Sequence, residues 1–166
     1  MRIDIDLDTQ TLTLSDGDGR EVASYPVSTA INGPGELAGS FCTPRGRHIV
    51  RARIGTGLPI NSVLVGRRPS GEIYHAEMGQ AQPERDWILS RILWLSGCEP
   101  GFNRLRECDS MCRYIYIHGT PDERFEQNPA SHGCIRMRNA DVIELFDLVP
   151  PFTEVVIHER IKPVAG

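Results

Sequence analysis

The stretch ASHGCIRM, residues 130–137, says more about the fold and chemistry of this 166-residue chain than any other part of its sequence. A cysteine nucleophile needs a nearby base, backbone donors for the oxyanion and a group that orients the base. Gly133 removes side-chain bulk immediately before Cys134, so a substrate carbonyl can approach the main chain there. A tight turn at this point directs successive N–H groups toward one spot, as in an anion-binding nest.

Two histidines are candidates for the base. His132 is adjacent to Gly133, and His118 lies sixteen positions before Cys134, at the end of a predicted strand over 113–117. Taken alone, the motif is equally compatible with a small buried cysteine beside a structural histidine. The residues by themselves therefore leave both the nucleophile and the choice of base open.

Further blocks give the motif a family context. Residues 118–120 (HGT) and 131–137 (SHGCIRM), followed by Asn139 and Asp141, resemble the signature of the L,D-transpeptidase (YkuD-type) catalytic domain. Other elements similar to that family are, in chain order, VST at 27–29, the glycines at 33–35, TPRG at 43–46 and a closing strand at 154–157. The resemblance covers most of the chain from about Ser28 onward.

The resemblance implies a single catalytic domain over 1–166, mainly β, with a YkuD-like sandwich of mixed sheets and one or two helices. It implies that Cys134 is the nucleophile, that His118 is the base and that the carbonyl of Gly119 orients His118. Main-chain N–H groups of His132, Gly133 and Cys134 are then expected to form the oxyanion hole. The side chains expected to contact substrate are Arg136, Ser131, Thr120, Tyr74 and His75. A structural ion pair is the competing role for Arg136.

The family's substrate is a peptidoglycan stem peptide. The resemblance implies attack on the carbonyl of the third stem residue, release of the terminal D-Ala and a thioester on the enzyme. An amine acceptor makes a crosslink, whereas water makes the enzyme a carboxypeptidase. The first residues, MRIDIDLDTQ, lack the apolar run of a secretory signal. We therefore expect a cytoplasmic L,D-carboxypeptidase that acts on soluble muropeptides in cell-wall recycling, with a crosslinking transpeptidase as the alternative.

Composition limits the remaining function classes. Eighteen basic and twenty-two acidic residues give a formal charge of −4, which argues against nucleic acid or an anionic membrane as the main partner. The five cysteines are odd in number and match no disulfide framework, so we expect free thiols. No cofactor or metal is expected, because Cys108 and Cys112 lack a second matching pair for zinc. A zinc-binding interaction domain and a non-catalytic stem-binding module stay as alternatives, and the oligomeric state stays open.

Hydrophobic periodicity predicts the main elements. Alternating apolar residues predict strands near the N-terminus, as at residues 3–7 and 22–25. Short apolar runs predict further strands at 48–54, 63–65, 72–74 and 153–158. Residues 139–148 predict a helix with Asn139 as N-cap. Apolar residues at helical spacing between Pro83 and Gly97 predict a second helix.

Overall fold

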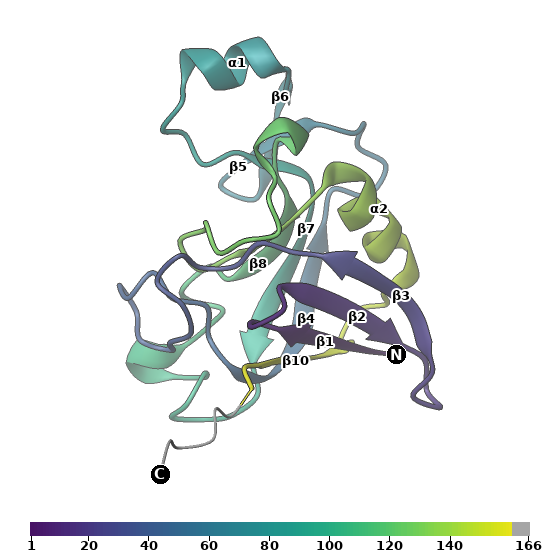
Figure 1. Ribbon diagram of the computed structural model, residues 1–166, viewed down its shortest axis with the longest axis vertical. Coiled ribbons are helices and arrows are strands. Elements are labelled where there is room, and N and C mark those ends of the chain that lie inside the picture. Colours follow the sequence, from purple (N-terminus) through teal and green to yellow (C-terminus); the bar gives the residue numbers. More distant parts are fainter. Residues whose placement is uncertain (161–166) are drawn as a thin grey trace.

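Ten strands form one curled, mixed sheet in the computed structural model, which describes residues 1–160 (Figure 1). In chain order the strands and helices are β1 (Arg2–Asp6), β2 (Thr11–Ser15), β3 (Glu21–Pro26), β4 (Gly46–Ile54), β5 (Ser62–Val65), β6 (Arg68–Ile73), α1 (Ala76–Ala81), β7 (Ile88–Gly97), β8 (Tyr116–Gly119), β9 (Ile135–Met137), α2 (Asn139–Leu148) and β10 (Glu154–His158). Two short 3₁₀ helices lie at Arg106–Cys108 and Asp122–Arg124. The mainly β class that the sequence predicts is confirmed. The last six residues of the predicted 1–166 domain lie outside the described part.

The sheet runs in the order β3-β2-β1-β10-β4-β7-β5-β6, and β8 joins it through β7 and carries β9. Two pairs are parallel, β1 with β10 and β8 with β9, and the others are antiparallel. The closing strand β10 therefore lies beside the first strand of the chain. A long-range pairing of this kind fixes the N-terminal strands to the part of the sheet that carries the site.

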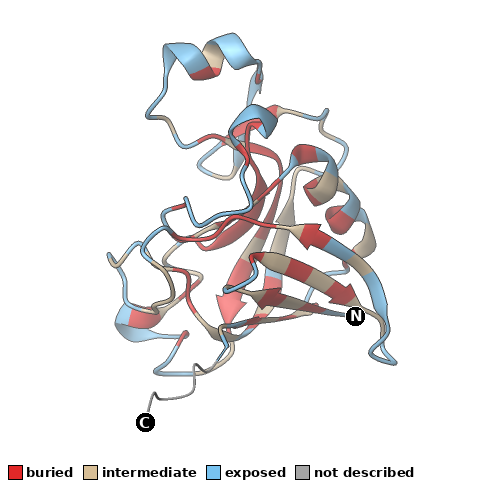
Figure 2. Ribbon diagram, viewed as in Figure 1, coloured by how far each residue is buried: buried red, intermediate tan, exposed pale blue. Residues whose placement is uncertain are grey.

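The main core lies between the curled sheet and α2, which packs against β7 and β8 (Figure 2). Alternation along the N-terminal strands buries Ile3 and Ile5 while their neighbours stay at least partly exposed. The apolar face of α2 is buried as its periodicity predicts, with Val142, Leu145 and Phe146 in this core. The predicted helix 139–148 is thus confirmed, although its N-cap is Arg138 and Asn139 is already the first helical residue.

The helix predicted between Pro83 and Gly97 is wrong, because this segment forms β7. Eight of the ten residues of β7 are buried, on both faces, and the strand pairs with β4, β5 and β8. A strand buried on both faces carries an almost continuous apolar run, and such a run can mimic helical spacing. The sequence predicts Trp87 and Trp94 on an amphipathic helix. Instead, Trp87 directly precedes this central strand and Trp94 lies within it.

The hairpin β5–β6 and the short helix α1 project together from one end of the molecule (Figure 1). All six residues of β6 are exposed, whereas β5 is anchored to β7 through the pairs Val63–Leu89 and Leu64–Ile88. Within residues 1–160, no helix has the length and apolar character needed to cross a membrane.

Candidate active site

The strands β8 and β9 bring the two parts of the motif onto one face of the sheet. Ile117 pairs with Ile135 and His118 with Arg136, so alternation divides the side chains into two sets. Ile117 and Ile135 point into the main core. The opposite face carries His118 and Arg136, and one residue pair earlier the same register places Cys134 beside Tyr116.

Two tyrosine backbones hold the sulfur of Cys134. The thiol donates to the carbonyl oxygen of Tyr114 at 3.3 Å, and the N–H of Tyr116 donates to the sulfur at 3.4 Å. Leu64 and Ile92 pack with Tyr116 in the apolar cluster that Cys134 adjoins. This burial raises the pKa of the Cys134 thiol to about 12, and the carboxylate of Asp86 also acts to raise it. The thiol is therefore protonated at neutral pH and needs a base.

His118 is fully buried, and its two ring nitrogens differ. Nδ1 lies 2.7 Å from the carbonyl oxygen of Gly119, so Nδ1 carries the proton and Nε2 is free to accept one. Within residues 1–160, buried Nε2 has no hydrogen-bond partner. Burial lowers the pKa of His118, which keeps its ring neutral at pH 7. A neutral imidazole held by a carbonyl, with an unoccupied acceptor nitrogen, has the form of a general base.

His132 has a different environment. It is exposed, and its ring meets that of Phe41 edge to face with a 5.7 Å separation between centroids. No contact within the described residues fixes either of its ring nitrogens toward Cys134. The geometry therefore favours His118 over His132 for the base.

The turn before Cys134 depends on a glycine and on two hydroxyls. Gly133 has φ +127°, and a Cβ there would lie 3.1 Å from the carbonyl oxygen of Cys42. Ser131 Oγ donates to the carbonyl oxygen of Cys134 at 2.6 Å and accepts the N–H of Gly133 at 3.2 Å. Thr43 Oγ1 donates to the carbonyl oxygen of Gly133 at 2.9 Å. The sequence predicts that Ser131 contacts substrate, but in this structure its buried side chain stabilises the turn.

Residues 28–43, upstream in the sequence, pack against this turn. An isolated bridge joins Ser28 to Arg136, and another joins Ala30 to Ser131. The Thr43 hydroxyl also accepts the N–H of Ala30, so Thr43 contacts both the motif and the upstream segment. The segment 28–43 therefore runs beside the motif and contacts its turn.

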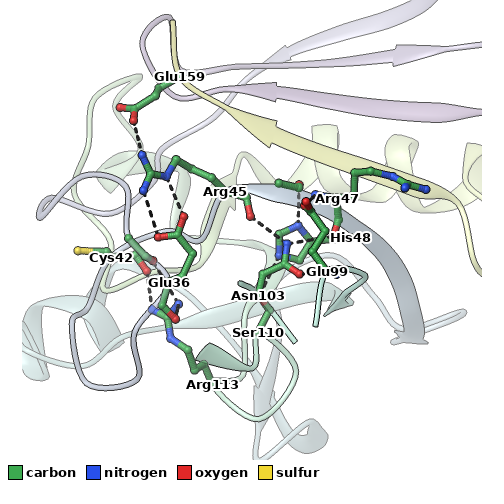
Figure 3. Close-up of polar contacts among 12 residues, drawn as sticks. Glu36, Cys42, Arg45, Arg47, His48, Glu99, Asn103, Ser110, Arg113 and Glu159 are labelled. Atoms are coloured by element: carbon green, nitrogen blue, oxygen red, sulfur yellow. Dashed lines mark hydrogen bonds and ion pairs between the residues drawn. The ribbon is translucent and has the colours of Figure 1, made fainter. Parts of the chain in front are cut away.

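Arg45 and Arg113 hold that segment in place through polar contacts (Figure 3). Arg45 pairs with Glu36 at 2.8 Å and with Glu159 at 2.6 Å. Arg113 donates to three main-chain carbonyl oxygens, those of Gly35, Glu36 and Cys42, the last at 2.7 Å. These contacts hold the loop whose Cys42 carbonyl abuts Gly133.

Asn139 joins the other end of the site to β7. Its amide donates to the carbonyl oxygen of Thr120 at 2.8 Å, and its Oδ1 accepts the hydroxyl of Ser90 at 2.6 Å. Ser90 has φ +68° and lies where the register between β7 and β8 shifts, directly after Leu89, which pairs with Gly119. Bulges of this kind occur next to active sites because they redirect nearby side chains. Asn139 thus fixes the bulge and the end of β8 together.

Arg136 is paired with a carboxylate. Its Nη2 lies 2.8 Å from Oδ1 of Asp86, and its Nη1 also donates to the carbonyl oxygen of Ala130 at 3.4 Å. This ion pair matches the structural role considered for Arg136. Asp86 is electrostatically close to the site, because its carboxylate acts to raise the pKa of both His118 and Cys134.

The remaining substrate-binding candidates lie apart from the sulfur. Buried Tyr74 packs against Trp87 and donates its hydroxyl to Glu123. Exposed His75 is the N-cap of α1. Thr120 is buried directly after β8 and hydrogen-bonds through its main chain to Met137 and Asn139. The described residues show no hydrogen bond from these three side chains to Cys134, His118 or Arg136.

Two hollows adjoin the site. One, of about 210 Å³, lies between the β5–β6 hairpin and the start of β7, with Leu64, Asp86 and Trp87 in its lining. The other, of about 280 Å³, is lined by residues that include Phe41, Arg113 and His132. Neither Cys134 nor His118 is among the residues that line these two hollows.

Several residues around the sulfur carry no signal in the sequence. Asp86 lies in a segment predicted to be helical, and Tyr114 and Tyr116 resemble ordinary strand residues. Only the pairing of β8 with β9 shows that these two tyrosines hold Cys134. All five cysteines are unpaired, and no cluster of three or more potential ligand residues among residues 1–160 is arranged to hold a metal ion.

Comparisons with known proteins bear on the fold and the family of this chain. Comparison with curated protein sequences finds no match. Among solved structures, the L,D-transpeptidase from Mycobacterium smegmatis aligns with 94% of this chain at 17% identity and a TM-score of 0.57. One from Xylanimonas cellulosilytica aligns with 94% at 23% identity and 0.54, and Mycobacterium tuberculosis L,D-transpeptidase 3, in complex with a faropenem-derived adduct, with 95% at 17% and 0.56.

At these identities the solved structures establish the fold. The chain spans 57–59% of the length of these three proteins. The sequence model of the YkuD family, the L,D-transpeptidase catalytic domain, matches residues 1–157, nearly the whole chain. The chain therefore belongs to the YkuD family of L,D-transpeptidase catalytic domains.

Proposed function

We propose that this domain cleaves the L,D-peptide bond of peptidoglycan tetrapeptide stems through a thioester on Cys134, with His118 as general base. The single observation that carries the proposal is the state of His118. Its Nδ1 is fixed to the Gly119 carbonyl at 2.7 Å, and its buried Nε2 is unpartnered within the described residues, on the face that also carries Cys134. A neutral thiol and a neutral imidazole make a competent pair if the proton moves as the sulfur attacks.

In the first half-reaction the Cys134 proton passes to Nε2 of His118 as the sulfur bonds to the carbonyl carbon of the third stem residue. The resulting oxyanion meets the main chain at residues 132–134. Because the Gly133 N–H already donates to Ser131 at 3.2 Å, we expect the Cys134 N–H to contribute most to binding the oxyanion. The carbon–nitrogen bond then breaks, His118 returns the proton to the departing nitrogen, and D-Ala leaves.

In the second half-reaction we propose water as the acyl acceptor, which makes the domain an L,D-carboxypeptidase acting on soluble muropeptides in the cytoplasm. Hydrolysis needs only a water molecule at the thioester and no second binding site for an amine acceptor.

Transpeptidation is the second candidate function. The presence of two hollows near the motif is compatible with separate sites for a donor stem and an acceptor amine. Several similar solved structures are described as L,D-transpeptidases. An amine acceptor would attack the same thioester and leave the first half-reaction unchanged.

One incubation distinguishes these functions. The protein is mixed with a soluble tetrapeptide muropeptide, with and without an excess of a second stem as amine acceptor, and the products are identified by mass spectrometry. Tripeptide plus free D-Ala, without dimer, is the expected result. A crosslinked dimer identifies a transpeptidase, and binding without turnover identifies a stem-binding module. Cys134→Ala is the control for background hydrolysis.

A further inference from the structure

The turn of the β5–β6 hairpin carries an arginine where such turns favour glycine. Val65 pairs with Arg68, so Gly66 and Arg67 form a two-residue turn, with φ of 54° and 65°. Two-residue hairpin turns with positive φ at both positions favour Gly, Asn or Asp there. A long side chain in this conformation is strained, and residues retained under strain tend to serve a function. The Arg67 side chain is therefore the feature to explain.

The guanidinium of Arg67 lies on an aromatic platform beside the nucleophile. It is 4.9 Å from the ring centroids of both Trp94 and Tyr114, and it donates to the hydroxyl of Tyr116 at 3.1 Å. Tyr114 and Tyr116 are the two residues whose main chains hold the Cys134 sulfur, at 3.3 and 3.4 Å. A single tyrosine thus separates Arg67 from the sulfur along either path.

A group that binds the carboxylate one residue beyond the scissile bond must lie within a limited distance of the nucleophile. The attacked carbon comes within about 3.5 Å of a nucleophile, and one extended residue adds at most ~3.6 Å. A charge-assisted hydrogen bond from a guanidinium to a carboxylate adds roughly 2.8 Å. A cation that binds the terminal carboxylate of a departing D-Ala must therefore lie within about 10 Å of the sulfur. Arg67 and the sulfur contact the same tyrosine, since the Tyr116 N–H lies 3.4 Å from the sulfur and the Tyr116 hydroxyl lies 3.1 Å from the guanidinium.

The other two arginines near Cys134 are already engaged. Arg136 pairs with Asp86 at 2.8 Å. Arg113 donates to the carbonyl oxygens of the loop that contains Cys42 (Figure 3). Arg67, in contrast, makes no ion pair with any carboxylate among residues 1–160, and its hydrogen bond to Tyr116 uses one of its five donors. Of these three arginines, Arg136 is neutralised by an ion pair and Arg113 is occupied by main-chain carbonyls, whereas Arg67 keeps most of its donors free.

We propose that Arg67 binds the terminal carboxylate of the stem peptide and thereby restricts the domain to the last peptide bond. This inference rests on the proposed function and adds a residue that selects substrates with a free C-terminus. Cation–π contacts with Trp94 and Tyr114 restrict the position of the guanidinium, whose fork geometry suits a two-pronged contact with a carboxylate.

The test compares two stems that differ at one group: a tetrapeptide with a free terminal carboxylate and the same peptide as its terminal amide. We would measure kcat/KM for both with the wild type, Arg67→Ala, Arg67→Lys and the matched control Arg68→Ala. Arg68 is the exposed neighbour on the same hairpin. The wild type should prefer the acid by roughly 10- to 100-fold, the range expected for hydrogen bonds to a charged group. Arg67→Ala should abolish the preference by losing activity on the acid only, Arg67→Lys should keep part of it, and Arg68→Ala should keep all of it.

A binding measurement separates this inference from the proposed function. Titration calorimetry of both peptides into Cys134→Ala, with and without Arg67→Ala, reports the preference without turnover. If the wild type cleaves neither peptide but Cys134→Ala binds the acid more tightly through Arg67, the proposed function fails and the inference stands. Three results would each overturn the inference. The first is an equal loss of activity on both peptides in Arg67→Ala, and the second is no preference in the wild type. The third is a preference that disappears in Arg136→Gln and persists in Arg67→Ala.

Discussion

At the scale of single residues, the motif around Cys134 indicates the chemistry but not its surroundings. Cys134, His118 and Gly119 could be named from the sequence because residues 118–120 and 131–137 resemble a family signature. The tyrosine backbones around the sulfur could not be predicted, because their contact with it depends on the register of two strands far apart in sequence. Arg67 was missed for the same reason.

The pH profile of cleavage tests the protonation states of the pair. Burial lowers the pKa of His118 below its usual 6.5 and raises that of Cys134 to about 12. The base is therefore active once the pH exceeds the lowered His118 value, and the thiol does not ionise in the neutral range. We expect kcat/KM to fall on the acid side only below pH 6.5, with no alkaline decline before about pH 10.

A bell-shaped profile that already falls above pH 8.5 would instead indicate a thiolate–imidazolium pair in the free enzyme. His132→Gln is the matched control, since His132 is exposed beside Phe41. Its profile should overlay that of the wild type.

Gly119 tolerates no side chain. A Cβ there would lie 2.5 Å from the carbonyl oxygen of Leu89 and 2.6 Å from Oδ1 of Asn139. Gly119→Ala should lower the free energy of unfolding by about 1–3 kcal/mol, the usual cost of overpacking. Urea denaturation measures this, and Gly17→Ala, where a Cβ meets nothing within 4 Å, is the control. Equal stability of the two variants would contradict the tight packing of β8 against β7.

At the scale of elements, periodicity predicted α2 and failed for β7. The helix at Asn139–Leu148 has one buried face and one exposed face, so its pattern identifies it. In β7 both faces are buried, and the apolar run then carries no period that distinguishes strand from helix. The pairing partners that make Ile88–Gly97 a central strand lie up to 49 residues away in sequence, as in the pair of His48 with Gly97, beyond the reach of a local pattern.

Asn139 tests how α2 is coupled to the site. Asn139→Ala removes the donor to the Thr120 carbonyl and leaves the buried hydroxyl of Ser90 without its acceptor. Each unsatisfied buried group costs about 1–3 kcal/mol, so we expect a loss of stability in that range or above, together with reduced cleavage. Chemical denaturation and the stem assay measure both effects. Exposed Asn128→Ala should change neither, and an unaffected Asn139→Ala would remove the proposed coupling.

At the scale of the whole molecule, the mainly β class followed from the sequence, whereas the order of strands did not. The parallel contact between β1 and β10 joins residues more than 150 positions apart, and no local pattern specifies it. The same holds for the loops that brace the motif, where Arg45 links Glu36 to Glu159 (Figure 3).

His48 makes the stability of the fold sensitive to acid. It is buried in β4 between the Gly46 carbonyl oxygen and the Ser110 hydroxyl, and burial lowers its pKa to about 4. Between pH 6.5 and 4 the unfolded chain binds a proton that the folded chain does not, so stability falls as the pH falls. The contribution of His48 is about 3 kcal/mol over this range.

Denaturation curves recorded between pH 7 and pH 4 measure this loss. The slope should decrease in His48→Gln, and it should persist in His75→Gln, whose side chain is exposed on α1. An unchanged slope in His48→Gln would mean that other groups control the acid response.

The most direct test of the central claim is the mass of the intact protein after brief exposure to a tetrapeptide stem, with the modified residue located by digestion. Cys134 should carry one acyl group equal to the stem minus D-Ala, the other four cysteines should carry none, and Cys134→Ala should show no adduct. Three results would contradict the assignment of Cys134 as the nucleophile: an adduct on another cysteine, an adduct that persists in Cys134→Ala, or release of D-Ala that does not depend on Cys134.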